Sequence, residues 1–241
     1  MTEHMQHDMH EEAVEAASGL TEELRNQLAD LCAKRERTYE LLARLFRVEI
    51  DEETYGNLRE ATFPAKTGNE KVDKGYRLIA TYLSNDHDDA VLQLAVDFVR
   101  VFIGHGNTAY SAAYPFESVY TSEKRLLMQE ARDEIMHRYA EAGLIIMPGW
   151  KDPEDHIALE LEYMQIMSRR VREALEAGDD EAALQRMALQ RDFLLKHLVS
   201  WIPMMTADMR RFAKTDFYQG LSYVTEGFLA EDRNFLVHAV Q

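Results

Sequence analysis

The sequence predicts an all-α protein: a single helical domain of about nine to ten helices, with two packed lobes as an alternative. Apolar residues recur at helical spacing along nearly the whole chain, and no segment of useful length alternates polar and apolar residues as a strand would. Apolar residues make up 46% of the 241 positions and charged residues 29%, which is the balance of a globular protein with one sizeable core. We find no internal repeat and no sustained heptad.

The expected helices follow from this periodicity and from capping residues. The first should begin after Thr21, a plausible N-cap that precedes two acidic residues. A later one should begin at Asp152, with Pro153 at its first position. The helix that Asp88 opens should bury a stripe of Leu92, Ala95, Val99 and Phe102. In chain order, we expect helices at about residues 21–48, 51–60, 70–83, 88–103, 122–142, 152–177, 181–201, 204–214 and 217–239.

Two stretches interrupt this pattern. Residues 104–115 form the one long irregular connection, where two packed lobes would join. Residues 1–19 are acidic and contain His and Met, and we expect them to be a disordered tail before a domain over residues 20–241. His4, His7 and His10 could form a soft-metal site, but incidental histidines in a solvated tail are the favoured interpretation.

Charge and cysteine content exclude several classes of function. The net charge of −16 opposes binding to nucleic acid or to an anionic membrane surface. Cys32 is the only cysteine, so neither an intrachain disulfide nor a cysteine-based zinc site can form. The first residues do not have the pattern of a secretory signal, and no apolar run approaches the ~20 residues that cross a bilayer. We therefore expect a cytoplasmic protein without membrane insertion.

Motifs for enzymatic chemistry are weak. The segment 104–109 formally fits the G-x-G-x-x-A dinucleotide pattern, but it follows a helical stretch instead of a strand, so a helix stop is favoured. The sequence has no P-loop. Glu134 and His137 form its only Glu-x-x-His pair, which is half of a di-iron site, and a surface pair is the better interpretation. We expect no enzyme activity, no cofactor and no metal site.

Three groups of residues remain as candidates for binding. In the helix predicted from Asp152, Asp155 would satisfy free amides of the first turn. His156 would be neutral near the positive helix end and could be oriented by Glu160. His197 and Trp201 lie four residues apart on one helical face, and the default interpretation is that they pack together as an aromatic corner. The aromatic segment 114–120 would either complete the core or line a peptide groove, and sequence physics leaves both open.

Taken together, these residues resemble the TorD-like family. Asp97–Gly104 and Tyr114–Tyr120 look like its central signatures, and Pro153–Met164 resembles its most diagnostic helix start. Phe193–Leu198 followed by Trp201–Pro203 is similar to its later helix motif. The blocks occur in family order from about residue 39 to 230. The acidic first twenty residues have no counterpart in this pattern.

The resemblance implies an all-helical cytoplasmic chaperone that binds the twin-arginine signal peptide of a molybdenum-cofactor oxidoreductase and delays its export until the cofactor is loaded. A monomer or a domain-swapped dimer is expected. The alternatives are a guanine-nucleotide-responsive protein and a metal carrier that uses the N-terminal histidines. The predicted peptide-binding residues are Tyr114, Pro115, Phe116, Glu117, Tyr120, Asp155, His156, His197 and Trp201.

A physical argument supports this choice of residues. A twin-arginine leader offers two guanidinium groups and then an apolar stretch that can form a helix, so its binder should pair carboxylates with an apolar groove. We hypothesise that Asp155 and Glu117 face the arginines, because both stand beside aromatic residues in the motifs.

Overall fold

The computed structural model describes residues 20–85, 87–104 and 111–240. These residues confirm the all-α prediction, because they contain no strand and only one isolated β-bridge, between Phe116 and His156. They form ten α-helices and two short π-helices. In chain order these are α2 (Glu22–Arg47), α3 (Glu52–Glu60), α4 (Glu70–Ser84), α5 (Ala90–Phe98), η1 (Val99–Ile103), α6 (Glu117–Thr121), α7 (Glu130–Glu141), α8 (Ile157–Glu176), α9 (Asp180–Phe193), η2 (Leu194–Leu198), α10 (Ile202–Phe212) and α11 (Asp216–Ala239).

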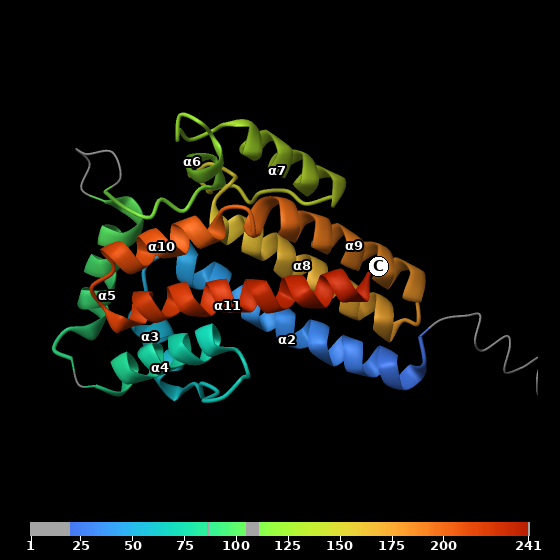
Figure 1. The fold of residues 1–241 in the computed structure, drawn as a ribbon, viewed down its shortest axis with the longest axis horizontal. Helices are drawn as coiled ribbons and strands as arrows, with labels where there is room; N and C mark the ends of the chain where they lie inside the picture. Colours follow the sequence, from blue (N-terminus) through green and yellow to red (C-terminus); the bar gives the residue numbers. More distant parts are fainter. Residues whose placement is uncertain (1–19, 86, 105–110, 241) are drawn as a thin grey trace, which may run out of the picture.

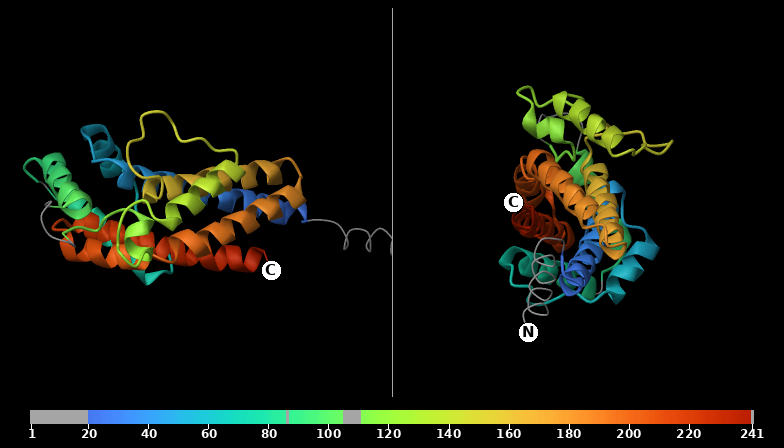
Figure 2. Two further views of the ribbon diagram at one scale, coloured as in Figure 1. Left: turned by 90° about the horizontal axis from the view of Figure 1, so that it is seen from above. Right: turned by 90° about the vertical axis from the view of Figure 1, so that its right-hand side faces the viewer.

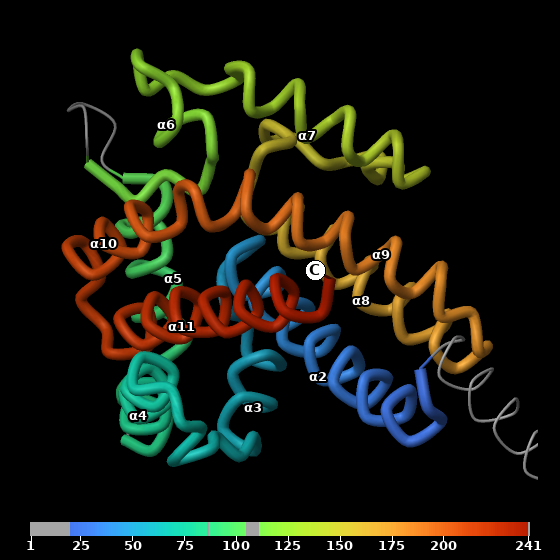
Figure 3. The backbone as a smooth tube through the Cα atoms, turned by 45° about the vertical axis from the view of Figure 1, so that its right-hand side comes forward, coloured from blue at the N-terminus to red at the C-terminus, as the bar shows by residue number. Residues whose placement is uncertain are grey.

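Helices from the two halves of the chain pack against each other. The most extensive contacts join α2 to α8 and α4 to α11, and α11 also contacts α10 and α9 (Figure 1). In a second view, α6 and α7 lie at one side of this bundle (Figure 3). Helices before residues 104–115 are therefore packed on helices after that segment, across the predicted join between two lobes.

Glycines allow α4 and α11 to approach closely. A Cβ atom on Gly75 would lie 2.6 Å from the carbonyl oxygen of Gly220, and one on Gly220 would lie 2.6 Å from that of Gly75. Further along the same pair of helices, a Cβ on Gly227 would lie 2.7 Å from a methyl group of Val72. Any larger residue at these positions would force the helices apart, so the small residues fix their separation.

Predicted helix starts are confirmed where a capping residue and the apolar periodicity agree. The side chain of Thr21 accepts a hydrogen bond from the backbone N–H of Leu24 at the start of α2. Asp51 does the same for Thr54 at the start of α3. The last two helices also lie within a few residues of their predicted bounds.

The predicted buried stripe of the helix after Asp88 is only partly right. Phe102 is buried as predicted, but Leu92 is 60% exposed, and Leu94, Phe98 and Val101 are the other residues that face the core. Asp97 lies on this buried face because its carboxylate accepts hydrogen bonds from the backbone N–H groups of Lys214 and Thr215, at 3.0 and 2.8 Å. Hydrogen-bond donors that are distant in the sequence thus allow this charged residue to be buried.

Two other predicted starts also differ. The helix expected from residue 122 begins at Glu130. The helix expected from Asp152 and Pro153 begins at Ile157, and its N-cap is His156. The backbone of His156 is extended after a turn at residues 154–155, and the backbone N–H of Ile157 donates to the carbonyl of Pro115 at 2.9 Å. Pairing with the 114–120 segment therefore delays the start of α8.

A buried polar network connects α2, α9 and α11. The guanidinium of Arg35 forms an ion pair with Asp232 and donates to the side-chain carbonyl of Gln190 at 2.6 Å. The hydroxyl of Tyr39 donates to the second oxygen of Asp232 at 2.6 Å. Arg35 and Asp232 are each 3% exposed, so the single cation and the single anion neutralise each other inside the bundle. We call these four residues the Arg35 network.

Near the other end of α9, the backbone changes from α- to π-helical over Leu194–Leu198. The change ends the helix that the sequence predicts to continue to residue 201, and α10 then begins at Ile202 with Pro203 in its first turn. His197 lies within the π-helix and Trp201 just before α10, and both side chains are buried. Across the described ranges, no helix combines the length and apolar character needed to cross a membrane.

Candidate functional site

The segment 114–120 is held against the start of α8 by Asp155. One carboxylate oxygen of Asp155 accepts a hydrogen bond from the backbone N–H of Ser118 at 2.8 Å, in the first turn of α6. Its backbone carbonyl accepts from the N–H of Glu117 at 3.0 Å. Asp155 is fully buried. Its carboxylate therefore satisfies an amide of α6, and not the first turn of its own helix as the sequence pattern predicts.

His156 is a buried, neutral N-cap. Its Nδ1 atom accepts a hydrogen bond from the backbone N–H of Ala158 at 3.0 Å, so the ring proton belongs on Nε2. Its ring meets Phe116 and Trp150 edge-on, with centroids 5.1 and 5.3 Å away. Burial, with a smaller contribution from the charge of Arg47, lowers the pKa of His156 to about 3. The predicted neutrality is confirmed, but its main cause is desolvation.

Glu117 and His197 form a second buried contact between the 114–120 segment and η2. The Nδ1 atom of His197 lies 3.0 Å from Oε2 of Glu117, and the two side chains are 1% and 5% exposed. Burial raises the pKa of Glu117, and the bond to His197 opposes that rise. The pair joins residues 80 positions apart, so it fixes α6 on the bundle.

Glu160 contacts Trp201 and not His156. Its Oε2 accepts a hydrogen bond from the indole N–H of Trp201 at 3.2 Å, whereas no hydrogen bond joins Glu160 to His156 in the described structure. Burial raises the pKa of Glu160 well above its usual range, and the nearby charge of Glu117 adds to the effect. The sequence signal for a buried carboxylate at Glu160 is its position inside the apolar run of residues 157–164.

Asp155, Glu117, Glu160 and His197 thus lie close together, and we call them the acid cluster. None of the four side chains is more than 5% exposed. One oxygen of Asp155 and one of Glu160 have no protein hydrogen-bond donor among the described residues. In this conformation neither Asp155 nor Glu117 is open to an arginine from outside.

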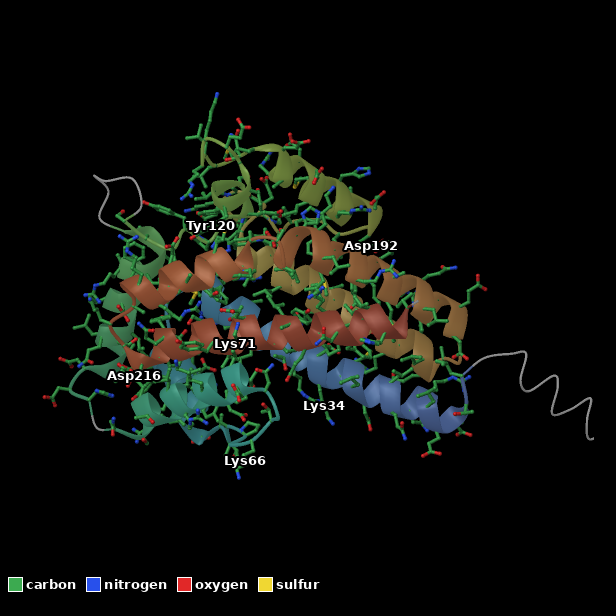
Figure 4. The ribbon with its side chains drawn as sticks, viewed as in Figure 1. Lys34, Lys66, Lys71, Tyr120, Asp192 and Asp216 are labelled. Atoms are coloured by element: carbon green, nitrogen blue, oxygen red, sulfur yellow. The ribbon has the colours of Figure 1, made fainter. Side chains whose placement is uncertain are left out.

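Tyr120 is partly exposed, and in the view of Figure 4 its label lies between α6 and α10. Its ring stacks on Trp201 with centroids 5.6 Å apart, and its hydroxyl donates to Asp208 of α10 at 3.3 Å. Burial raises the pKa of Tyr120, and Asp208 raises it further. Tyr114 is also half-buried, but its hydroxyl contacts Ser111 at 3.1 Å and not the cluster. Pro115 and Phe116, in the same segment, are buried.

The motifs that were weak indications of enzymatic or metal chemistry form no such site among the described residues. Glu134 forms an ion pair with Lys196 at 2.9 Å, and His137 lies 3.2 Å from Glu141, as expected for surface pairs. Within the described ranges, no group of three or more His, Cys, Asp or Glu side chains could hold a metal ion. The histidines of residues 1–19 and most of the 104–109 pattern lie outside the described residues.

The fold and these contacts define an all-helical protein with an acidic cluster beneath aromatic side chains. Over residues 68–207, more than half of the chain, the sequence matches the family described as "Nitrate reductase delta subunit". The chain therefore belongs to this family, and the TorD-like resemblance is confirmed.

Its relatives include proteins named "Chaperone protein TorD". The one from Vibrio parahaemolyticus is 29% identical over 85% of this chain and 95% of its own. Those from Vibrio cholerae and Escherichia coli are 25% and 27% identical, over 89% and 76% of this chain and 97% and 87% of their own. These names denote chaperones and not enzymes, and they give no support to the guanine-nucleotide alternative.

Proposed function

We propose that this protein is a system-specific chaperone of molybdoenzyme maturation that acts in the cytoplasm. It binds the twin-arginine signal peptide and N-terminal region of a catalytic subunit, assists cofactor insertion and holds the subunit back from export. Membership of the family and the relatives' name as chaperones support this role. The observation that carries it is the meeting of segment 114–120, Asp155, His156, His197 and Trp201 in one cluster.

Charge favours such a partner at long range. A net charge of −16 attracts a segment that carries adjacent arginines and raises its rate of encounter. A charge pair about 4 Å apart contributes only ~1 kcal/mol in bulk water and ~4 kcal/mol near a protein surface, before desolvation is counted. Specificity therefore depends on particular carboxylates and rings close to the bound peptide.

The nine predicted residues have two roles in this proposal. The half-buried rings of Tyr114 and Tyr120 contact the peptide directly. The seven other side chains are buried and hold these rings in place. Asp155 and Glu117 face the arginines of a bound leader only when segment 114–120 shifts, which would free their carboxylates from Ser118 and His197.

Calorimetry with a synthetic leader from a molybdoenzyme precursor tests the proposal. We expect binding by the full chain, weaker binding when both arginines are replaced by glutamine, and weaker binding by Tyr120→Ala. The variants Asp155→Ala and Glu117→Ala should also bind more weakly. Failure to bind any precursor leader, or robust turnover of a small molecule, would overturn the proposed function. Gel filtration checks whether the protein is a monomer or a domain-swapped dimer.

A further inference from the structure

A second candidate surface lies beside the acid cluster, under the loop that connects α7 to α8. In Figure 2 this loop stands off the helices as a wide arch. Beneath it is an apolar groove of about 500 Å³, which lies within the usual range for ligand sites. Its lining is mostly aliphatic and aromatic and includes Leu144, Ile146, Trp150, Leu159, Tyr163 and Ile166.

Two large apolar side chains on this loop are unusually open to solvent. Ile145 is 89% exposed and Met147 is 78% exposed, and both line the groove. Exposed apolar groups that gather at the edge of an apolar groove are typical of a surface that binds another molecule. The indole N–H of Trp150 is also buried without an acceptor among the described residues, so the loop does not satisfy all its own polar groups.

The groove contains an arginine site that the chain itself occupies. Arg47, the last residue of α2, forms an ion pair with Glu162 of α8. Its guanidinium also lies over the ring of Trp150, 5.8 Å from the centroid. A carboxylate beside an aromatic face is an arrangement that recognises a guanidinium group well. Arg47 and Glu162 are 38% and 37% exposed, so water and a competing cation can reach the pair.

This arginine site adjoins the motif that carries the proposed function. Trp150 contacts the ring of His156 at 5.3 Å, and the charge of Arg47 acts on the same ring. A peptide that approaches the acid cluster could therefore extend into the groove without leaving the surface.

We infer that the groove binds the apolar stretch of the client's leader, and that one leader arginine displaces Arg47 from Glu162 and Trp150. The inference rests on the proposed function and places part of the leader outside the predicted residues. Arg47 then acts as a placeholder that keeps the carboxylate paired when no leader is bound. The order of the leader, cations first and apolar residues after, matches an arginine site at one side of an apolar groove.

Calorimetry with a peptide of two adjacent arginines followed by an apolar run of about ten residues tests the exchange. Removal of the competing guanidinium by Arg47→Gln should tighten binding by about fivefold. Removal of the carboxylate charge by Glu162→Gln should weaken binding by about tenfold. Arg172 and Glu176 form a matched pair at the far end of α8, so Arg172→Gln and Glu176→Gln should leave the affinity unchanged.

The apolar part of the inference has its own test. The double variant Ile145→Ser, Met147→Ser should bind the long peptide at least fivefold more weakly, because two anchoring side chains are lost. The same variant should bind a short peptide, with both arginines but no apolar run, as the unaltered protein does. Both positions are exposed, so the melting temperature should not change.

The outcomes separate this inference from the proposed function. Binding that is unchanged by Arg47→Gln, Glu162→Gln and the Ile145/Met147 variant, but lost in Tyr120→Ala, would overturn the groove and leave the chaperone role intact. Failure of the unaltered protein to bind any leader would overturn both. Concentration-dependent dimers that the Ile145/Met147 variant abolishes, with leader affinity unchanged, would show that the groove binds a second copy and would overturn the inference.

Discussion

The Arg35 network and the acid cluster are both buried and polar, but their charges are arranged differently. In the Arg35 network one cation faces one anion, and both oxygens of Asp232 accept hydrogen bonds. The acid cluster brings three carboxylates together with one histidine. Two of these carboxylates, Asp155 and Glu160, each keep an oxygen without a protein donor in the described structure.

This difference in charge arrangement distinguishes a buried region that stabilises the bundle from one that is suited to a functional role. A charge-balanced, nearly saturated network between helices holds a structure together, and removing one partner is costly. A cluster with excess like charge raises pKa values and stores repulsion that the rest of the fold must offset. Such clusters occur preferentially at functional sites, which is consistent with the proposed role of the segment above it.

The largest expected effect is in the Arg35 network. The substitution Arg35→Met leaves Asp232 buried without its cation, so the free energy of unfolding should fall by about 3–5 kcal/mol. Urea denaturation measures the change. The double variant Arg35→Met, Asp232→Leu should recover most of the loss, because an apolar pair needs no partner. A loss below about 1 kcal/mol would contradict the structural role of this network.

Matched tyrosine substitutions compare the two regions directly. Tyr39→Phe removes a buried hydrogen bond to a carboxylate and should lower the free energy of unfolding by about 2 kcal/mol. Tyr120→Phe removes a longer, partly exposed bond to Asp208 and should change it by less than about 0.5 kcal/mol. Thermal denaturation of both variants measures the difference. Equal losses would break the contrast between the regions.

A third prediction concerns pH. The folded pKa of His156, about 3, lies below its unfolded value near 6.5, so the unfolded chain binds the extra proton first. The stability due to neutral His156 is therefore present above pH 6.5 and is lost by about 1.4 kcal/mol per pH unit as the pH falls towards 3.

His156→Asn isolates this effect, because asparagine can still accept the capping hydrogen bond but does not titrate. Between pH 7 and 5, the unaltered protein should lose about 2 kcal/mol more of its unfolding free energy than the variant does. Urea titrations at each pH provide the measurement. Parallel curves for the two proteins over this range would contradict the assignment.

The last prediction concerns Glu160. Its folded pKa is raised, so its contribution to stability is fully present at pH values below its unfolded pKa and is lost as the pH rises towards the folded value. Glu160→Gln keeps an acceptor for Trp201 and removes the titration, so it should stabilise the protein by about 1 kcal/mol at pH 7. The gain should shrink as the pH approaches 4.5, and destabilisation at pH 7 would contradict the excess-charge interpretation.

Much of the fold could be predicted because local signals agreed. At Thr21 and Asp51 a capping side chain and an apolar period begin together, and both helices start there. The exposure of Leu92 and the burial of Asp97 could not be predicted in this way, since the partners of Asp97 are 117 and 118 positions away. Local periodicity assigns buried positions to apolar residues instead of charged ones, because it contains no information about the partners across the core.

The sequence indicates the residues of the candidate site but not the hydrogen bonds between them. The family resemblance singled out Asp155, His156, His197 and Trp201, and the structure brings their segments together. The resemblance could not indicate that Asp155 accepts a hydrogen bond from the first turn of another helix, α6. Nor could it indicate that Glu160 accepts one from the indole N–H of Trp201. Hydrogen-bond partners across 37 to 80 positions depend on how the helices pack, which spacing along one helix does not encode.

The pairing of α4 with α11 has a consequence for how the protein is made. During synthesis, α2 and α4 leave the ribosome long before the helix that supplies Asp232 and Gly220. Until then, the nascent chain exposes apolar faces that have no partner, a state prone to aggregation. The residues of α11 must therefore be synthesised before this protein acquires the shape with which it could protect another polypeptide.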